Sequence, residues 1–581
     1  SRKINLYSMR PQIYADVKLA KNLTWLTKGA IGFSSEFNKR HESPIDNYYF
    51  DDGSYAHNNA VWQQGVRDLM TQNFETTLYS TLNYQKSIGN HNLNALAGYN
   101  QESNYYRELR GSRLTFPTTT ISELNAGAAL GQSTGGTANE WAIQSLFGRL
   151  MYDYNGKYLF EVNARRDGTS RIAPETRWGT FPSVSAGWRI SEESFLRSVS
   201  WLDNLKLRAS WGKLGNQNVG LYPYQDLLST TSYPFDGLAP GVQLNALRDR
   251  SLKWESTTVT DFGVDFGMKN GLISLTADWF NKVTDDILYQ IPIPASVGLS
   301  SPTINYGKMK NTGWEFELGH RNTIGELSYN VNFNFTTFKN KVLDVVSPAY
   351  GNTIGKEGLP FNAYYLIEWD GIFQSQDEID KAPKHPFNPK PGDLKYRDAN
   401  GDGIIDSKDR VVVDGAYAKF YYGGSINLAW KNFDLSAFFQ GVQGNKLYVG
   451  GSHMAWGYTP FVQGSSPTMD YLKDMWTPSN PSNTTPAIYQ SQYKPNTGTA
   501  STYWLLDASY MRLKNLAIGY SFTNDVTRSI GLKGLRVYVS GDNLLTVTDY
   551  PGADPERSCT GCRFSVYPQV TTYAVGVKAT L

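Results

Sequence analysis

The sequence predicts an all-β fold, a transmembrane antiparallel β-barrel, and three observations support this prediction. The first is a strict alternation of apolar and polar residues, clearest in residues 327–336, which read LSYNVNFNFT. Because the side chains of a strand alternate between its two faces, one face of this segment is apolar and the other carries mostly asparagine. Asparagine needs several hydrogen-bond partners, so the second face is expected to meet water or a polar lumen.

The second observation is length, since about 10 residues is the span of a tilted strand that crosses a bilayer. The third is the aromatic content of 14%, with 38 Tyr and 15 Trp. These residues are favoured at bilayer interfaces, where a ring has one apolar and one wet end. A Tyr-rich soluble β-protein that binds sugars has the same composition and stays an alternative.

Composition excludes several other classes. The mean hydropathy is −0.44 and the chain has no run of 18 apolar residues, so no transmembrane helix is predicted. The net charge of +2 gives no reason to propose a nucleic-acid partner. The first residues, SRKINLYSM, do not resemble a signal peptide, and the chain is therefore expected to be a mature protein or a piece of one.

The predicted strands come in pairs that short turns connect. Asn155-Gly156 and Lys269-Asn270-Gly271 are examples of such turns between alternating segments. In chain order, the predicted strands are 10–20, 23–34, 74–85, 92–108, 141–154, 157–166, 182–191, 204–213, 256–268, 272–290, 308–321, 327–336, 420–430, 433–440, 510–522, 535–542 and 570–581.

Long connections separate these pairs, at about residues 36–72, 110–140, 214–254, 344–417, 447–504 and 547–567. Loops of this length are rare in compact soluble domains. Short turns on one side and long loops on the other are typical of outer-membrane barrels, with the short turns in the periplasm. Such barrels have even strand numbers. The count of about 17 therefore suggests that residues 1–581 are the C-terminal portion of a larger barrel.

One segment has the spacing of a calcium-binding loop. Oxygen-bearing side chains occupy positions 1, 3, 5, 9 and 12 of a 12-residue loop, and position 7 offers a carbonyl. These candidate ligands are Asp398, Asn400, Asp402, Ile404, Asp406 and Asp409. Position 12 is Asp rather than Glu, and the flanking residues do not look helical. A structural calcium ion and an acidic Asx/Gly turn without metal are the two interpretations.

The cysteines are Cys559 and Cys562, separated by two residues in a stretch rich in Gly and Pro. A redox pair needs a helix N-terminus to lower the thiol pKa, whereas these flanks suggest a loop followed by a strand. A zinc site needs further ligands, and the histidines are scattered singly. A local disulfide is the preferred interpretation over free thiols.

Catalytic motifs are absent from the sequence, which predicts that the protein is not an enzyme. Asp261 with Asp265, and Glu315 with Glu317, each share one face of a strand and are expected to line a lumen rather than form an acid/base pair. Loop aromatics are candidates for stacking on a sugar substrate, or else for packing the loop or contacting a partner protein. These are Trp456, Tyr458 and Trp476.

Several stretches resemble the SusC/RagA family of TonB-dependent outer-membrane transporters. The most specific are GDLKYRDANGDGIIDSKDR at 392–410 and FFQGVQGN at 438–445. Further matches are NARRDGTSRIAPETRWGTFPSVSAGWRISEE at 163–193, LRASWGKLGNQ at 207–217, DMWTPSNPSN at 474–483, YMRLKNLAIGYSF at 510–522 and VSGDNLLTVTDYPGADPE at 539–556. They follow the family's order over most of the chain from about residue 150 onward.

The resemblance implies a 22-stranded barrel with a plugged lumen, located in the bacterial outer membrane. It implies nutrient import of oligosaccharides or peptides, with a SusD-like surface lipoprotein as a lid and a dimer of transporter–lipoprotein pairs. It further implies that TonB pulls on an N-terminal plug, which residues 1–581 lack along with the first strands. Leu581 also stands where the family usually has an aromatic residue. A passive porin and a soluble β-rich glycan-binding protein are the alternatives.

Overall fold

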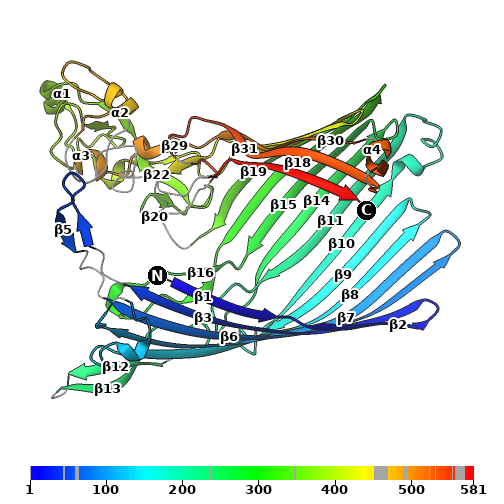
Figure 1. The fold of residues 1–581 in the computed structure, drawn as a ribbon, viewed down its shortest axis with the longest axis horizontal. Helices are drawn as coiled ribbons and strands as arrows, with labels where there is room; N and C mark the ends of the chain where they lie inside the picture. Colours follow the sequence, from blue (N-terminus) through cyan, green and yellow to red (C-terminus); the bar gives the residue numbers. More distant parts are fainter. Residues whose placement is uncertain are drawn as a thin grey trace. The chain divides into compact units, whose positions relative to one another are not determined.

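The fold is described from a computed structural model (Figure 1). The structure describes residues 2–42, 46–58, 64–118, 120–226, 228–234, 237–345, 349–449, 469–488, 494–522, 524–529, 531–552, 554–556 and 569–580. Within these ranges, no helix is both long enough and apolar enough to cross a bilayer.

One antiparallel sheet of 18 strands dominates the described residues. The strands β1 (Arg2–Met9) and β2 (Gln12–Ala20) pair with successive parts of the same strand, β3 (Leu23–Glu42). They therefore share one position, and the described sheet has 17 positions. All of the strands predicted from alternation correspond to these positions, which confirms the tally.

The chain divides into two compact units, of which unit 1 comprises Ser1–Ala186, Trp211–Thr257 and Asp286–Tyr306. In unit 1, β3 pairs with β6, and each following strand pairs with the next in chain order up to β9. These strands are β6 (Gly65–Ile88), β7 (His91–Leu114), β8 (Ser133–Tyr154) and β9 (Tyr158–Thr169). Short elements in the connections are β4 (Asp46–Tyr48), β5 (Tyr55–Asn58), η1 (Leu124–Ala126), β12 (Leu228–Pro234), β13 (Leu238–Leu244), β16 (Leu288–Gln290), η3 (Ala295–Val297) and β17 (Thr303–Asn305).

Unit 2 comprises Gly187–Ser210, Thr258–Asp285 and Gly307–Leu581. Its strands also pair in chain order from β15 to β32. They are β15 (Ile273–Asp285), β18 (Lys308–Ile324), β19 (Leu327–Asp344), β26 (Phe420–Trp430), β27 (Phe433–Gln443), β30 (Tyr510–Ser521), β31 (Gly534–Thr548) and β32 (Thr572–Thr580). The strands β10 (Trp178–Arg189), β11 (Leu202–Asn216) and β14 (Glu255–Met268) contribute residues to both units, and η2 (Ile190–Glu192) and α4 (Asn524–Ser529) lie in unit 2.

The predicted turn chemistry is confirmed where β8 passes into β9. Asn155 and Gly156 have φ angles of 56° and 68°, the left-handed values that two-residue hairpin turns require. Glycine adopts such values without strain and asparagine with little, so the dipeptide fixes this hairpin.

The predicted ends of the long strands were wrong. β6 begins at Gly65 and β7 extends to Leu114, well inside segments predicted as loops. Alternation marks only the part of a strand that has one apolar face. Beyond that part apolar residues such as Met70 and Leu109 no longer alternate regularly with polar ones, yet the backbone pairing between β6 and β7 continues to the end of each strand.

Each strand has one apolar and one polar face, as predicted. In unit 2, Phe316 of β18 stands opposite Phe335 of β19, whereas Glu317 stands opposite Asn334 on the other face. The apolar side chains are not covered by protein: Phe333 is 44% exposed and Leu318 is 46% exposed. An exposed apolar surface of this extent is expected where a protein meets lipid.

We predict that Phe333→Arg lowers the free energy of unfolding from a bilayer by about 2–4 kcal/mol, because it places a charge in the hydrocarbon region. Unfolding of the protein in lipid vesicles by urea measures this change. The matched control is Asn334→Arg, which adds the same side chain to the polar face of the same strand. Equal losses for both variants would contradict the assignment of the two faces.

Candidate functional site

The connections after β19 and β27 in unit 2 fold together into a compact substructure, here called the loop domain (described residues 349–417, 445–449, 469–488 and 494–508). Its elements are β20 (Ala349–Tyr350), β21 (Thr353–Ile354), β22 (Ala363–Ile367), β23 (Trp369–Ile372), α1 (Gln376–Lys381), β24 (Leu394–Tyr396), η4 (Ser407–Asp409), β25 (Arg410–Val413), β28 (Lys446–Tyr448), α2 (Met469–Asp474), α3 (Lys494–Thr497), η6 (Thr502–Trp504) and β29 (Leu505–Asp507). Figure 1 shows α1, α2 and α3 gathered together with β20, β22 and β29.

The loop domain has its own apolar core, which includes the fully buried side chains of Leu394 and Trp504. Buried polar groups join the segment that follows β19 to the segment that follows β27. Asn496 accepts a hydrogen bond from the Leu394 N–H (2.8 Å) and donates one to the Asp393 carboxylate (3.0 Å). Because buried polar groups are costly unless paired, these contacts hold the two long segments in one arrangement.

The predicted calcium loop lies in this domain, between β24 and β25. Its side chains accept hydrogen bonds from the loop's own backbone. Asp398 accepts from the N–H groups of Gly401 (2.7 Å) and Gly403 (2.8 Å), and these bonds, Gly403 first, lower the pKa of its carboxyl despite the opposing effect of burial. Asn400 accepts from the Asp402 N–H (2.8 Å), and Asp402 from the Ile404 N–H (3.0 Å).

Asp409, at position 12, is fully buried. Its Oδ1 accepts from the Ala399 N–H (3.0 Å) and its Oδ2 from the Asp406 N–H (2.8 Å). In the described part of the chain, no three His, Cys, Asp or Glu side chains are arranged as a metal site. The hydrogen bonds are those of the metal-free Asx/Gly turn. Each carboxylate oxygen keeps a second lone pair, so the donor set still suits a hard cation and calcium stays a prediction.

Trp476 is the one predicted loop aromatic among the described residues. Its indole N–H donates to Gln374 Oε1 (2.9 Å), and its ring packs against the core of the loop domain. A Cβ on Gly392 would come within 2.5 Å of the ring, so a glycine is needed beneath it. Trp456 and Tyr458 lie outside the described residues, as do Cys559 and Cys562. Substrate contact and the disulfide therefore stay predictions.

The polar face of the sheet carries charged groups in matched pairs in unit 2. Arg208 binds both oxygens of Asp265 (2.9 Å each) and also Asp278 (2.9 Å). The Arg208–Asp278 pair passes over Gly263 of β14, where a Cβ would come within 2.2 Å of Asp278 Oδ1. In the same way, Arg536 of β31 reaches across β30 to Asp434 of β27 (2.8 Å). Asp265 thus lies on the polar face, and its predicted lumen-lining role stays a prediction.

In unit 1 the polar face carries asparagine beside glutamate, in addition to the Arg165–Asp167 ion pair of β9 (2.7 Å). An asparagine amide donates to the glutamate two residues away on β3, β6, β7 and β9, at distances of 2.8–3.2 Å. The pairs are Asn38–Glu36, Asn73–Glu75, Asn100–Glu102 and Asn163–Glu161. Among the described residues, none of these glutamates forms an ion pair. The four glutamates are partly exposed and keep acceptor capacity for a polar solute, whereas Asn38 and Asn100 are themselves buried.

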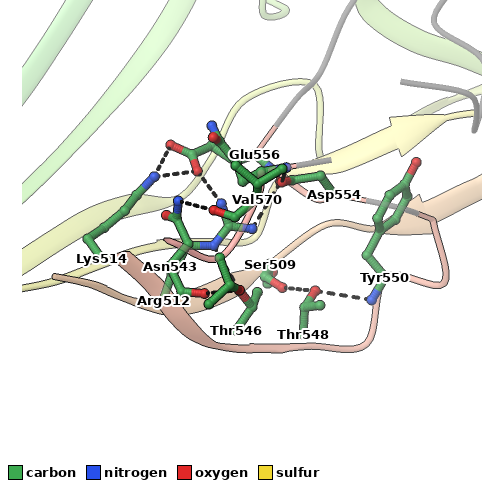
Figure 2. Close-up of polar contacts among 12 residues, drawn as sticks. Ser509, Arg512, Lys514, Asn543, Thr546, Thr548, Tyr550, Asp554, Glu556 and Val570 are labelled. Atoms are coloured by element: carbon green, nitrogen blue, oxygen red, sulfur yellow. Dashed lines mark hydrogen bonds and ion pairs between the residues drawn. The ribbon is translucent and has the colours of Figure 1, made fainter. Parts of the chain in front are cut away.

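A cluster of buried charges lies beside the connection between β31 and β32 in unit 2 (Figure 2). Arg512 of β30 donates to Thr546 Oγ1 (2.8 Å), Glu556 Oε2 (2.6 Å) and Asp554 Oδ1 (3.0 Å). Lys514, two residues further along the same strand, also binds Glu556 (2.6 Å). The side chains of Arg512 and Asp554 are only 3% and 2% exposed. We call this set, Arg512, Lys514, Asp554 and Glu556, the clamp.

The clamp was missed at the level of sequence. Arg512 and Lys514 alternate with Met511 and Leu513, which places both cations on the polar face of β30. That signal is present in the sequence. The carboxylate partners, however, lie 42 and 44 residues away, and alternation within one strand gives no information on such pairings.

We expect a calorimetric titration of the full-length protein with Ca²⁺ to show weak binding, with a Kd on the order of 10⁻⁴–10⁻³ M. Asp402→Ala removes a ligand of position 5 and should abolish this heat. The control is Asp377→Ala on α1, where the carboxylate binds Lys381. An unchanged calcium heat in Asp402→Ala would remove the calcium interpretation.

The clamp is expected to persist in mild acid. Burial alone would raise the pKa of the Asp554 carboxyl, but the N–H groups of Gln569 and Glu556 and the Arg512 guanidinium hold the pKa below its usual 3.8. Among the described residues, the charged or titratable groups around Asp554 are Arg512, Glu556 and Tyr510. A lowered native pKa stabilises the fold above the unfolded-state value and is lost below the native one. The protection of the Gln569 amide, its exchange rate compared with that of an unstructured peptide at the same pH, should therefore persist at pH 4.5 and be lost only below 3.8. Loss of protection already between pH 6 and 5 would contradict this.

Comparison with known proteins identifies the fold. The family model described as "TonB dependent receptor-like, beta-barrel" matches residues 8–544. TonB-dependent receptor P3 of Formosa agariphila is 31% identical over 86% of this chain and 51% of its own length. TonB-dependent receptor SusC of Bacteroides thetaiotaomicron is 30% identical over 75% of this chain and 43% of its own. The chain thus spans about half the length of the curated relatives it matches.

Among solved structures, the RagAB peptide transporter matches with a TM-score of 0.83 at 24% identity, over all of this chain and 62% of that one. At that identity the likeness concerns the fold. It agrees with the long antiparallel strands and with their exposed apolar faces. The chain belongs to the TonB-dependent receptor family and forms an outer-membrane β-barrel wall of the SusC/RagA type.

Proposed function

We propose that this chain is the barrel wall of a nutrient importer that takes up oligosaccharides or peptides across the outer membrane. The observation that carries the proposal is the polar face of unit 1. Its asparagine–glutamate pairs offer amide donors and carboxylate acceptors side by side on four strands. Hydroxyl groups of sugars and backbone amides of peptides bind groups of these kinds.

The position of these pairs relative to the hydrocarbon region of the membrane also supports the proposal. On β7, the apolar face turns polar at Gln101 and Ser103, and Ser103 hydrogen-bonds to Thr76 of β6 (2.6 Å). Glu102 and Glu75 stand beside these residues on the opposite face. A strand that leaves the hydrocarbon region near Gln101 presents Glu102 near the outer end of the membrane-spanning part. A solute that arrives from outside meets these side chains early.

The partners follow from the same proposal. Import requires a plug that TonB can pull, supplied by an N-terminal portion of the transporter, and a SusD-like surface lipoprotein as a lid over the long loops. Two such transporter–lipoprotein pairs would form a dimer. A calcium ion in residues 398–409 would be structural and would stabilise the loop domain, and no residue is assigned a catalytic role.

The remaining alternative for a protein in this membrane is a passive porin. Uptake of labelled oligosaccharides and peptides by cells that produce the full-length protein distinguishes the two. We expect uptake to stop when the proton gradient of the inner membrane is dissipated, because TonB draws its energy there. Uptake that continues without the gradient would contradict active import and favour the porin.

A substitution in the wall tests the assignment of the polar face. Glu75→Leu removes one acceptor, and we expect the uptake rate at low substrate concentration to fall about tenfold, as for a lost hydrogen bond to a charged group. The matched control is Thr76→Leu, the next residue on β6, which lies on the apolar face. A loss in Thr76→Leu equal to that in Glu75→Leu would count against substrate contact at Glu75.

A further inference from the structure

The connection between β31 and β32 is held at both of its ends by side chains of the sheet. At the first end, Asp554 and Glu556 bind Arg512 and Lys514 of β30. At the other end, Asn543 of β31 donates to the Val570 carbonyl (3.1 Å) and the Thr571 hydroxyl donates to the Asn543 carbonyl (3.1 Å). Figure 2 shows Val570 drawn close to the clamp residues.

Asp554 joins these two ends directly. Its Oδ1 accepts from Arg512 and from the Glu556 N–H (2.9 Å), whereas its Oδ2 accepts from the Gln569 N–H (2.9 Å). One carboxylate thus orders residues 554–556 and residue 569, which are far apart in sequence. Because the carboxylate is buried, its charge depends on the Arg512 guanidinium for compensation.

The start of the same connection contacts the loop domain. Tyr550 packs against the apolar core of that domain, and burial raises the pKa of its hydroxyl. The Tyr550 N–H donates to Thr548 Oγ1 (3.1 Å), and the Thr548 hydroxyl in turn donates to the Ser509 carbonyl (2.8 Å). Ser509 directly precedes β30 and follows the last residue of the loop domain.

The loop domain is therefore tied to the strand that carries the clamp. The Ala508 N–H donates to the Asn445 carbonyl (3.0 Å), and Ser509 Oγ accepts from the Gly444 N–H (2.9 Å). Arg512 lies three residues after this junction, and its guanidinium packs over the Tyr510 ring at 5.6 Å. Residues 508–512 thus contact the loop domain at one end and the β31–β32 connection at the other.

We propose that Arg512 is a positioning residue of the transporter. It fixes the described ends of the β31–β32 connection, residues 554–556 and 569, to β30 just beyond the loop domain, so that these residues and the loop domain move as one body. This proposal rests on the proposed import function, in which the long loops lie over the entrance. It assigns to Arg512 a role in how the entrance opens, distinct from contact with the substrate.

The chain contains a matched comparison for this role. Arg536 also binds a carboxylate on the polar face, Asp434, but this pair joins strands β27 and β31 and involves no residue of the long loops. Arg536 and Asp434 are about one-third exposed, at 30% and 34%, whereas Arg512 and Asp554 are almost fully buried. Removal of Arg536 therefore tests the loss of a wall ion pair without the loss of the clamp.

The experiment is hydrogen exchange, read by mass spectrometry, on the full-length protein in detergent micelles. In Arg512→Met, we expect the amides of Glu556 and Gln569 to exchange on the order of 100-fold faster, because their acceptor, Asp554, loses its buried partner. The exchange of β30 and β31 should stay unchanged. In Arg536→Met, the amides of Glu556 and Gln569 should keep the rates of the unmodified protein.

If the two loop regions move as one body, a second and separate result is expected. Tyr550→Ala cuts the apolar contact with the loop domain but leaves the clamp residues in place. It should speed exchange at the start of the connection while Gln569 stays protected. In Arg512→Met, transport at saturating substrate should fall with little change in the half-saturating concentration, since the substrate contacts are intact.

Three results would overturn the proposal. Unchanged exchange at Glu556 and Gln569 in Arg512→Met would show that Arg512 does not hold the connection. Equal acceleration throughout β30 and the loop domain would show a general structural role instead. Full transport in Arg512→Met, although the connection exchanges faster, would show that the clamp has no role in how the entrance opens. If Arg512→Met fails to fold, the milder Lys514→Met carries the same test, with an increase of about tenfold expected from the loss of one charged hydrogen bond.

The outcomes for Arg512 and for the import function are separable. Exchange reports on the clamp whether or not any substrate is transported. Loss of active import with an intact clamp would contradict the proposed function alone. An exchange pattern independent of Arg512 in an active importer would contradict the clamp alone.

Discussion

The constraint on which the rest of this structure depends is the pairing of every backbone group within a sheet whose two faces meet different surroundings. In a bilayer no water is present to bond a free N–H or C=O, so the strands must pair along their whole length. The side chains of each strand then divide strictly between an exposed apolar face and a polar one. This division decides where charges can be placed. The ion pairs Arg208–Asp278 and Arg536–Asp434 both lie on the polar face, and each crosses a strand at a glycine.

The same constraint explains what could be predicted from the sequence. Strands such as β9 and β19 were found because one face is apolar, which produces a period of two. The ends of β6 and β7 were missed because the apolar face ends before the strand does. Residues 398–409 do form a loop between two strands, which their local spacing predicts, whereas calcium binding there stays a prediction. Three backbone N–H groups donate hydrogen bonds to the Asp409 carboxylate. These bonds were not predicted, because they depend on how the loop closes.

The loop domain and the clamp could not be derived from local patterns. The core around Trp504 and Leu394 joins segments about a hundred residues apart, and Asp554 meets Arg512 from another connection. Such contacts arise from packing, for which the alternation of single strands carries no signal. The resemblance to the SusC/RagA family nevertheless included the stretches that hold the clamp, YMRLKNLAIGYSF and VSGDNLLTVTDYPGADPE. It identified these segments as important without indicating that they touch.

The great length of β6 and β7 has a consequence for how a solute is first sorted. Each has 24 residues, whereas about 9–11 suffice to cross the hydrocarbon region. The surplus extends the wall beyond the hydrocarbon region, and Glu75 and Glu102 lie near the level proposed for its outer boundary. In the proposed importer, selection by charge would begin at this outer boundary, where mobile ions weaken it over a distance of about 8 Å at physiological ionic strength. The ionic strength of the surroundings would then influence which solutes enter.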